Sequence, residues 1–157
     1  MISNKKMKEL LSDIDLSNIE LKNYYSVFER VRSNNEKYWI ISNETDCSMC
    51  SAVVSKEINL TNFEWHNNEI YIANSIDIKQ ILNLSLKMFM SLKKLLEENY
   101  PYQIFDLVLS LSYSKDNTPP SADIRFYAVR DGFRIIDIEN IENYKSDAVL
   151  IETVNNN

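Results

Sequence analysis

Alternation of apolar and polar residues is clearest over residues 105–113. Phe105, Leu107, Leu109 and Leu111 alternate there with polar side chains that include Asp106. A period of two is typical of a strand with one buried face. Residues 123–128 alternate in the same way, so we expect two half-buried strands in this part of the chain.

The pattern continues beyond these strands. Asp131 and Gly132 predict a tight hairpin turn, because glycine readily adopts the positive φ angle that such turns need. Residues 133–138 are then expected to form the return strand of that hairpin. Residues 148–154 are expected to form the last strand of the sheet.

Residues 77–99 have the strongest helical period, with a cap from Asp77 and Gln80 and a stop at Pro101. One broad face is apolar and comprises Ile78, Ile81, Leu82, Leu86, Phe89, Leu92 and Leu96. Further apolar residues lie on other sides of the helix, at Leu84, Met88, Met90 and Leu95. We therefore expect a long central helix that is covered on more than one side.

The N-terminal half is less regular. Residues 7–14 fit one helix, and Ser17 with Glu20 predicts the cap of a second helix, whose apolar stripe ends at Phe28. Residues 37–42, 58–65 and 69–73 are expected to be strands, with residues 66–68 as the turn between the last two. Residues 43–57 have no clear period, although residues 52–54 fit a short strand.

Together these elements predict an α+β fold, with a mostly antiparallel sheet of about five or six strands, N-terminal helices and one long central helix. The chain of 157 residues has 45% hydrophobic and 25% charged residues, a globular composition that suits one domain over residues 1–157. It contains no internal repeat and no linker composition that would divide this domain.

Composition also excludes several functional classes. The single glycine, Gly132, rules out glycine-rich phosphate-binding loops. The net charge of −6, without clustered bases, argues against nucleic-acid binding. Neither a membrane-spanning run nor a signal peptide is recognisable, so we expect no membrane partner and a cytoplasmic location.

Candidate chemistry is sparse. Cys47 and Cys50 form a Cys-x-x-Cys motif, but zinc would need about two more ligands and His66 is the only histidine. We expect two ordinary thiols there, and a solvated His66 in a turn beside Glu64 and Glu69. No catalytic residue, metal ligand or cofactor is therefore predicted. Asp106, Asp123 and Arg125 are expected to lie on the non-core side of adjacent strands and to form a cross-strand ion pair.

Acidic residues are concentrated near the C-terminus. From Asp131 onward there are six acidic residues and only two basic ones, Arg134 and Lys145. One interpretation is a solvated face. The functional interpretation is a surface that attracts a basic protein partner, and the residues we assign to it are Asp137, Glu139, Glu142 and Asp147.

Residues 105–112 (FDLVLSLS) and 124–132 (IRFYAVRDG) carry a resemblance. With residues up to 154, they resemble the bacterial immunity proteins that neutralise contact-dependent or polymorphic toxins. The resemblance implies a small cytoplasmic protein that binds the catalytic domain of a toxin, with a nuclease as the expected toxin, and blocks its active surface.

Two other functional classes stay open. One is a small enzyme or ligand-binding domain whose site combines Arg125, Asp106, Glu64 and His66 in an apolar pocket. The other is an adaptor subunit, which would expose an apolar patch on the central helix.

Overall fold

The computed structural model describes residues 1–12, 14, 19, 21–42, 54–73, 75–113 and 119–155, and it is an α+β fold as predicted. Its main sheet is antiparallel, with the order β1 (Ile2–Ser3), β7 (Ala148–Val154), β5 (Phe105–Ser112), β6 (Ser121–Ala128) and β4 (Glu69–Ile72). A separate two-stranded ribbon comprises β2 (Ser26–Val31) and β3 (Lys37–Ser42). The helices in the described residues are α1 (Lys5–Leu11), α2 (Leu60–Asn67) and α3 (Ile78–Asn99), and a 3-10 turn covers Ile141–Asn143.

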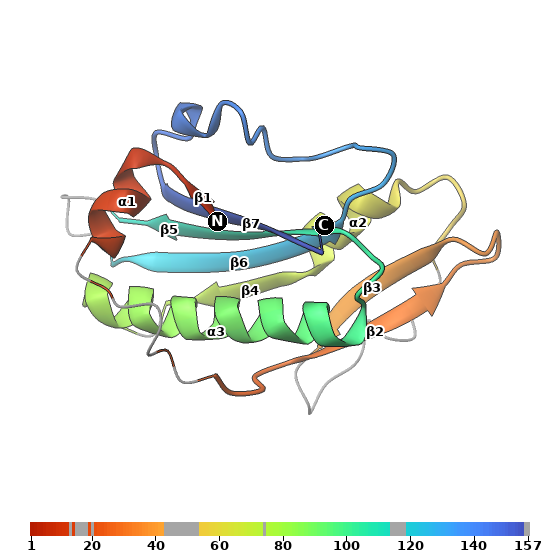
Figure 1. The fold of residues 1–157 in the computed structure, drawn as a ribbon, viewed down its shortest axis with the longest axis horizontal. Coiled ribbons are helices and arrows are strands. Elements are labelled where there is room, and N and C mark those ends of the chain that lie inside the picture. The colour runs from red at the N-terminus through yellow and green to blue at the C-terminus, as the bar shows by residue number, and fades with distance from the viewer. Residues whose placement is uncertain are drawn as a thin grey trace.

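The helix α3 runs along one face of the main sheet (Figure 1). Its apolar face includes the fully buried Ile81, Phe89 and Leu96, which belong to one core cluster with Leu107 and Leu109 of β5. Burial of such side chains contributes roughly 1.5–3 kcal/mol each. The position of this helix was therefore predictable from its apolar period.

The predicted N-terminal cap of α3 and its expected covering can both be compared with the structure. The Asp77 side chain accepts a hydrogen bond from the Lys79 N–H at 2.8 Å, whereas Gln80 bonds Ser75 and does not complete a capping box. On the side of α3 away from the sheet, the Lys22 N–H donates to the Ser91 hydroxyl at 3.2 Å. Residues 21–25 thus cross the outer side of α3, which confirms a helix covered on more than one side.

The expected second N-terminal helix is wrong over Ser26–Val31, which form strand β2. Phe28 lies opposite Ile40 in β3, and Val27 opposite Ile41. The apolar spacing that suggested one helix belongs to two different segments. Tyr24 packs on the main core before the strand begins, whereas Phe28 belongs to the strand itself. The proposed cap at positions 17 and 20 lies outside the described residues, as do positions 43–53.

The strand predicted at residues 58–65 is also wrong, since Leu60–Asn67 form helix α2. Asn59 caps it by accepting the Asn62 N–H at 3.0 Å. The buried residues of α2 include the polar Thr61 and Glu64, so the sequence has no apolar stripe from which this helix could be predicted. His66 consequently lies in the last helical turn rather than in a hairpin turn, and β4 pairs with β6 instead.

The turn at Asp131 and Gly132 is confirmed, with φ angles of 50° and 74° and a 2.8 Å bond from the Phe133 N–H to the Arg130 carbonyl. The return strand is not formed, however, and only an isolated bridge joins Arg130 and Phe133. β5 occupies one edge of β6, and β4 pairs with Ala122–Arg125 on the other edge. Beyond β4, the backbone groups of Phe126 and Ala128 bond to side chains from Asn68 and from α2, which take the place of a return strand. Residues 130–147, called the arm from here on, instead cross the face of the sheet opposite α3 (Figure 1).

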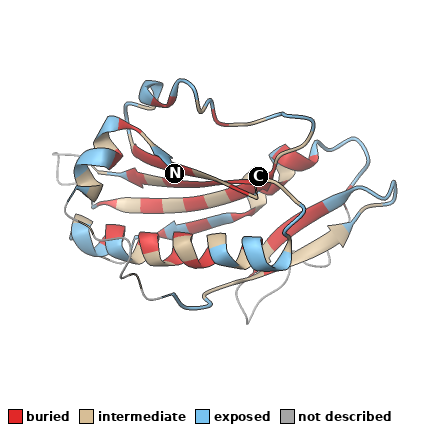
Figure 2. Ribbon diagram, in the orientation of Figure 1, coloured by how far each residue is buried: buried red, intermediate tan, exposed pale blue. Residues whose placement is uncertain are grey.

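Strand β5 is buried on both faces over most of its length, which corrects the expectation of a half-exposed strand. Its first five residues are all buried, including Asp106 and Val108 on the side of the arm. Figure 2 shows buried residues along the length of the central strands. The arm therefore acts as a second covering layer over this part of the sheet.

Candidate functional site

The arm packs on the sheet through its own small apolar core. Ile136 and Ile141 of the arm are buried together with Val108 of β5 and with Val149 and Ile151 of β7. An irregular segment covers a sheet stably only if its backbone polar groups find partners. The contacts that supply those partners define the candidate site.

A buried carboxylate holds the start of the arm. Asp106 is fully buried and pairs with the Arg134 guanidinium. It also accepts hydrogen bonds from the Thr153 hydroxyl at 2.8 Å and the Tyr127 hydroxyl at 3.0 Å. The predicted Asp106–Arg125 pair is thus wrong, because Asp106 faces the arm and not the solvent. A buried carboxylate is costly unless it is paired and hydrogen-bonded in this way.

Two tyrosine hydroxyls accept backbone N–H groups of the arm, which has no neighbouring strand in the described residues to accept them. The Tyr127 hydroxyl accepts the N–H groups of Ile135 at 3.1 Å and Ile136 at 3.4 Å while it donates to Asp106. The Tyr144 hydroxyl accepts the Asp137 N–H at 3.2 Å. Burial, reinforced by the negative charge of Asp106, raises the pKa of Tyr127 well above its usual range, so this phenol stays protonated.

The far end of the arm is held by Asn4, which is 2% exposed. Its Nδ2 donates to the carbonyls of Tyr144 at 3.0 Å and Asp147 at 2.8 Å. Its Oδ1 accepts the N–H of Val149 at 3.0 Å and, as the N-cap of α1, the N–H of Met7 at 3.1 Å. One side chain thereby joins the arm, β7 and α1.

Glu64 of α2 forms a second buried charge pair at the root of the arm. Its carboxylate accepts from Arg130 at 2.6 and 2.8 Å, from the Trp39 N–H at 2.9 Å and from the Ala128 N–H at 2.8 Å. Asn68, one helical turn further, donates to the Trp39 carbonyl at 2.9 Å. The two side chains join the ribbon to the main sheet. Burial raises the pKa of the Glu64 carboxyl, although the hydrogen bonds from Arg130 oppose the shift.

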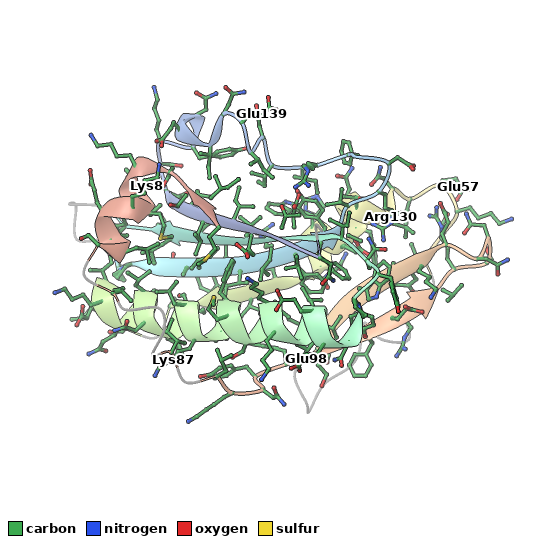
Figure 3. All side chains as sticks on the ribbon, in the orientation of Figure 1. Lys8, Glu57, Lys87, Glu98, Arg130 and Glu139 are labelled. Carbon is green, nitrogen blue, oxygen red and sulfur yellow. The ribbon has the colours of Figure 1, made fainter. Side chains whose placement is uncertain are left out.

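Two of the four acidic residues assigned to partner binding lie on the outer, solvent-exposed side of the arm. Asp137 and Glu139 are both exposed. Asp137 also shapes its own turn, since it accepts the Asn140 N–H at 3.2 Å and Asn140 Nδ2 at 2.9 Å. In Figure 3, Glu139 lies on the arm side of the sheet, whereas Glu98 lies on α3 on the other side.

The other two acidic residues are engaged within the protein. Glu142 is exposed like Asp137 and Glu139, but it accepts the Lys5 N–H at 3.1 Å and lies 3.8 Å from the Lys8 Nζ, so it contacts α1. Asp147 is partly buried and accepts the Ser146 hydroxyl at 3.1 Å. The four residues that the sequence grouped together therefore occupy two different environments.

A groove of about 660 Å³ opens between the arm and the edge of β7. It is lined by Ile2 of β1, Thr153 of β7 and the first half of the arm, at Gly132, Phe133, Arg134, Ile135, Ile136, Asp137, Ile138 and Glu139. Phe133 is 48% exposed and Ile2 is 45% exposed. Apolar surface therefore lies directly beside the exposed carboxylates of the arm.

Three residues of the alternative enzyme site, Arg125, Asp106 and Glu64, have separate ion-pair partners. Arg125 stacks 5.0 Å from the Trp65 ring centre and pairs with Glu69 at 2.5 Å and Asp123 at 3.1 Å. Asp106 and Glu64 are saturated by other arginines, as described above. Burial raises the pKa of the Asp123 carboxyl, with Arg125 opposing the shift.

Other candidate sites can be assessed only within the described ranges. There, no group of three or more His, Cys, Asp or Glu residues has metal-binding geometry, and no helix is both long and apolar enough to cross a membrane. Cys47 and Cys50 lie outside these ranges. All of α3 is described, and none of its large apolar side chains is exposed, so the patch expected of an adaptor is not found on this helix.

Sequence reasoning missed Arg134, Tyr127, Tyr144 and Asn4, which position the arm. The available signal was an isolated arginine among acids just after a predicted turn, together with one acid, Asp106, in an otherwise neutral strand. No protein-family model, curated protein or solved structure matches this chain. The comparisons therefore assign no family, and the function must be inferred from the surface that the arm presents.

Proposed function

We propose that this chain is an immunity protein, which binds a basic toxin domain in the cytoplasm through the arm and blocks its active surface. The observation that carries the proposal is the arm itself. It is an irregular segment held by buried polar contacts, with Asp137, Glu139 and the aromatic ring of Phe133 left on its outer side.

The charge of the arm supports a basic partner. Arg130 and Arg134 pair with the buried carboxylates of Glu64 and Asp106. On the outer side of the arm, the exposed acids Asp131, Asp137, Glu139 and Glu142 outnumber the exposed base Lys145. Negative charge in one region steers a basic protein toward it and accelerates association.

The rigidity of the arm supports tight binding. Association loses affinity when loops must become ordered at the interface, and a loop held beforehand avoids much of that loss. The hydroxyls of Tyr127 and Tyr144 and the side chain of Asn4 hold the arm at its middle and its far end. Exposed Phe133 supplies an aromatic anchor, a residue type that often dominates binding energy.

A nuclease toxin is the expected partner class. Such enzymes bind phosphates through basic surfaces, and an acidic inhibitor can occupy the same surface. The inhibitor would then compete with nucleic acid for the enzyme.

The test is a cleavage assay with the toxin domain encoded beside this gene. Adding the protein should abolish cleavage of nucleic acid at a one-to-one ratio, and raising the nucleic-acid concentration should restore cleavage. A neighbouring toxin domain that neither binds the protein nor loses activity would contradict the proposal. So would turnover of a small-molecule substrate by the protein itself.

A further inference from the structure

The groove beside the arm has one wall formed by the edge of the main sheet. Val149 directs its N–H and its C=O to Asn4, at 3.0 and 3.1 Å. Backbone groups of an antiparallel strand alternate between its two edges, so Thr153, four residues later, directs its own groups to the same edge. β1 pairs with this edge of β7 at Ile2 opposite Ile151 and Ser3 opposite Leu150. The groove thus lies along the side of β7 that faces β1, with Ile2 and Thr153 in its lining.

The other wall is formed by residues 132–139 of the arm. Phe133, Ile135 and Ile138 line the groove, and each is at least partly exposed. Ile2 closes the apolar surface from the side of β1, at 45% exposure. An apolar patch that is rimmed by charged residues is typical of a protein-binding site.

The charge of the groove is negative. Its ionisable residues are Arg134, Asp137 and Glu139, and the Arg134 guanidinium is paired with the buried Asp106. The carboxylates of Asp137 and Glu139 are left on the rim. A complementary ligand therefore carries an apolar side chain with lysine or arginine close to it.

We propose that this groove binds one extended segment of the basic partner, with a large apolar side chain against Phe133 and flanking basic side chains on Asp137 and Glu139. The inference rests on the proposed function and names the chemistry of the bound segment. An extended segment suits the groove because the lining follows eight consecutive positions, residues 132–139, along the arm.

A second copy of the chain is the main alternative occupant. Each copy carries a net charge of −6, and the groove has acidic residues on its rim. Like charges brought together in an interface oppose association. The charge complementarity of the groove therefore favours a basic partner over self-association.

The test uses a synthetic peptide, acetyl-Lys-Ile-Lys-Val-Lys-Ile-Lys-amide, and follows the amide signals of the protein by NMR. We expect shifts at Ile2, at residues 132–139 and at Thr153. The acidic peptide with Glu in place of each Lys should leave these signals unchanged. Shifts elsewhere only, no shifts with the basic peptide, or equal shifts with both peptides would overturn the proposal.

Two variants separate the groove from the rest of the surface. Phe133→Ala should weaken peptide binding by about fivefold or more, as expected for an aromatic anchor. Tyr102→Ala is the matched control, because Tyr102 is fully exposed but does not line the groove. Equal weakening in both variants would contradict the proposal. A wild-type protein that sediments as a dimer, together with a Phe133→Ala variant that sediments as a monomer, would also contradict it.

The outcome for the groove can be distinguished from that for the proposed function. If the toxin domain binds wild type and Phe133→Ala equally well, the groove assignment fails and the immunity function stands. If the toxin domain does not bind at all but the basic peptide fills the groove, the immunity function fails and the groove assignment stands.

Discussion

The two faces of the main sheet are stabilised in different ways. On the face toward α3, β5 presents Phe105, Leu107, Leu109 and Leu111, all fully buried against apolar neighbours. On the face toward the arm, the same strand presents Asp106, whose partners lie 21, 28 and 47 residues away in sequence. Apolar burial is non-directional, whereas a buried carboxylate requires particular donors in particular places.

This difference separates the scaffold from the candidate binding surface. Apolar packing sets the position of α3 on the sheet. Buried charges and hydroxyls set the path of the arm, whose apolar contacts are limited to a small cluster around Ile136 and Ile141. Substitutions on the two faces should therefore have different consequences, and the largest should be on the face of α3.

Phe89→Ala should lower the free energy of unfolding by about 3–5 kcal/mol, because it leaves a cavity in a fully buried part of the core. Leu109→Ala should cost about 2–5 kcal/mol for the same reason. Denaturant titration measures both values. A wild-type midpoint for either variant would show that the residue is not part of the core.

Asp106→Ala tests the opposite face. We expect a loss of about 3 kcal/mol, at the low end for a broken buried pair because Arg134 is partly exposed to water. The double variant Asp106→Ala with Arg134→Ala is the matched control, since it removes both charges. It should be less destabilised than the sum of the two single variants, and simple additivity would contradict a direct pair.

Tyr127→Phe removes only the hydroxyl that the arm uses. The free energy of unfolding should fall by about 1–2 kcal/mol, and the amides of Ile135 and Ile136 should exchange with solvent much faster. Tyr71→Phe is the control, because Tyr71 is 67% exposed on β4. Unchanged exchange at Ile135 would mean that the Tyr127 hydroxyl does not hold the arm.

The pH dependence of stability tests the charge pair at the root of the arm. The pKa of Glu64 is higher in the folded protein than in the unfolded chain, so folding favours its protonated form. Its contribution to stability is therefore greatest at low pH and is lost as the pH rises through the folded pKa. From pH 4.5 towards neutrality, wild type should lose stability relative to Glu64→Gln. A difference between the two that stays constant with pH would contradict the shift.

The sequence predicted the elements whose side chains follow one period. The alternation that ends at Leu111 and the helix that begins at Asp77 were both found as expected. Helix α2 could not be predicted in this way, because its buried residues Thr61 and Glu64 are polar and are stabilised by distant partners. The return strand after Gly132 failed because pairing order within a sheet is a long-range property.

The candidate site was predicted in part. The acidic character of the C-terminal region was visible in the sequence. Which of its acidic residues contact the protein itself, and which contact only solvent, was not. Glu142 is used by α1 through Lys8, whereas Glu139 is exposed on the arm. Whether an acid faces a partner or its own protein depends on contacts between residues more than 130 positions apart.

The smallest expected effect on stability accompanies the most direct test of the proposed function. Asp137→Lys with Glu139→Lys should lower the free energy of unfolding by only about 1 kcal/mol, because both side chains are exposed and only the exposed bonds from Asn140 to Asp137 are lost. The control is Glu97→Lys with Glu98→Lys, which makes the same change in net charge on α3, on the opposite face of the sheet (Figure 3).

The measurement is the association rate constant with the toxin domain, at low and at high salt. The account predicts that the arm variant associates much more slowly than wild type, that the α3 variant is affected far less, and that salt reduces the difference. Equal rates for both variants, or a wild-type rate that is independent of salt, would contradict the assignment of the arm as an acidic binding surface.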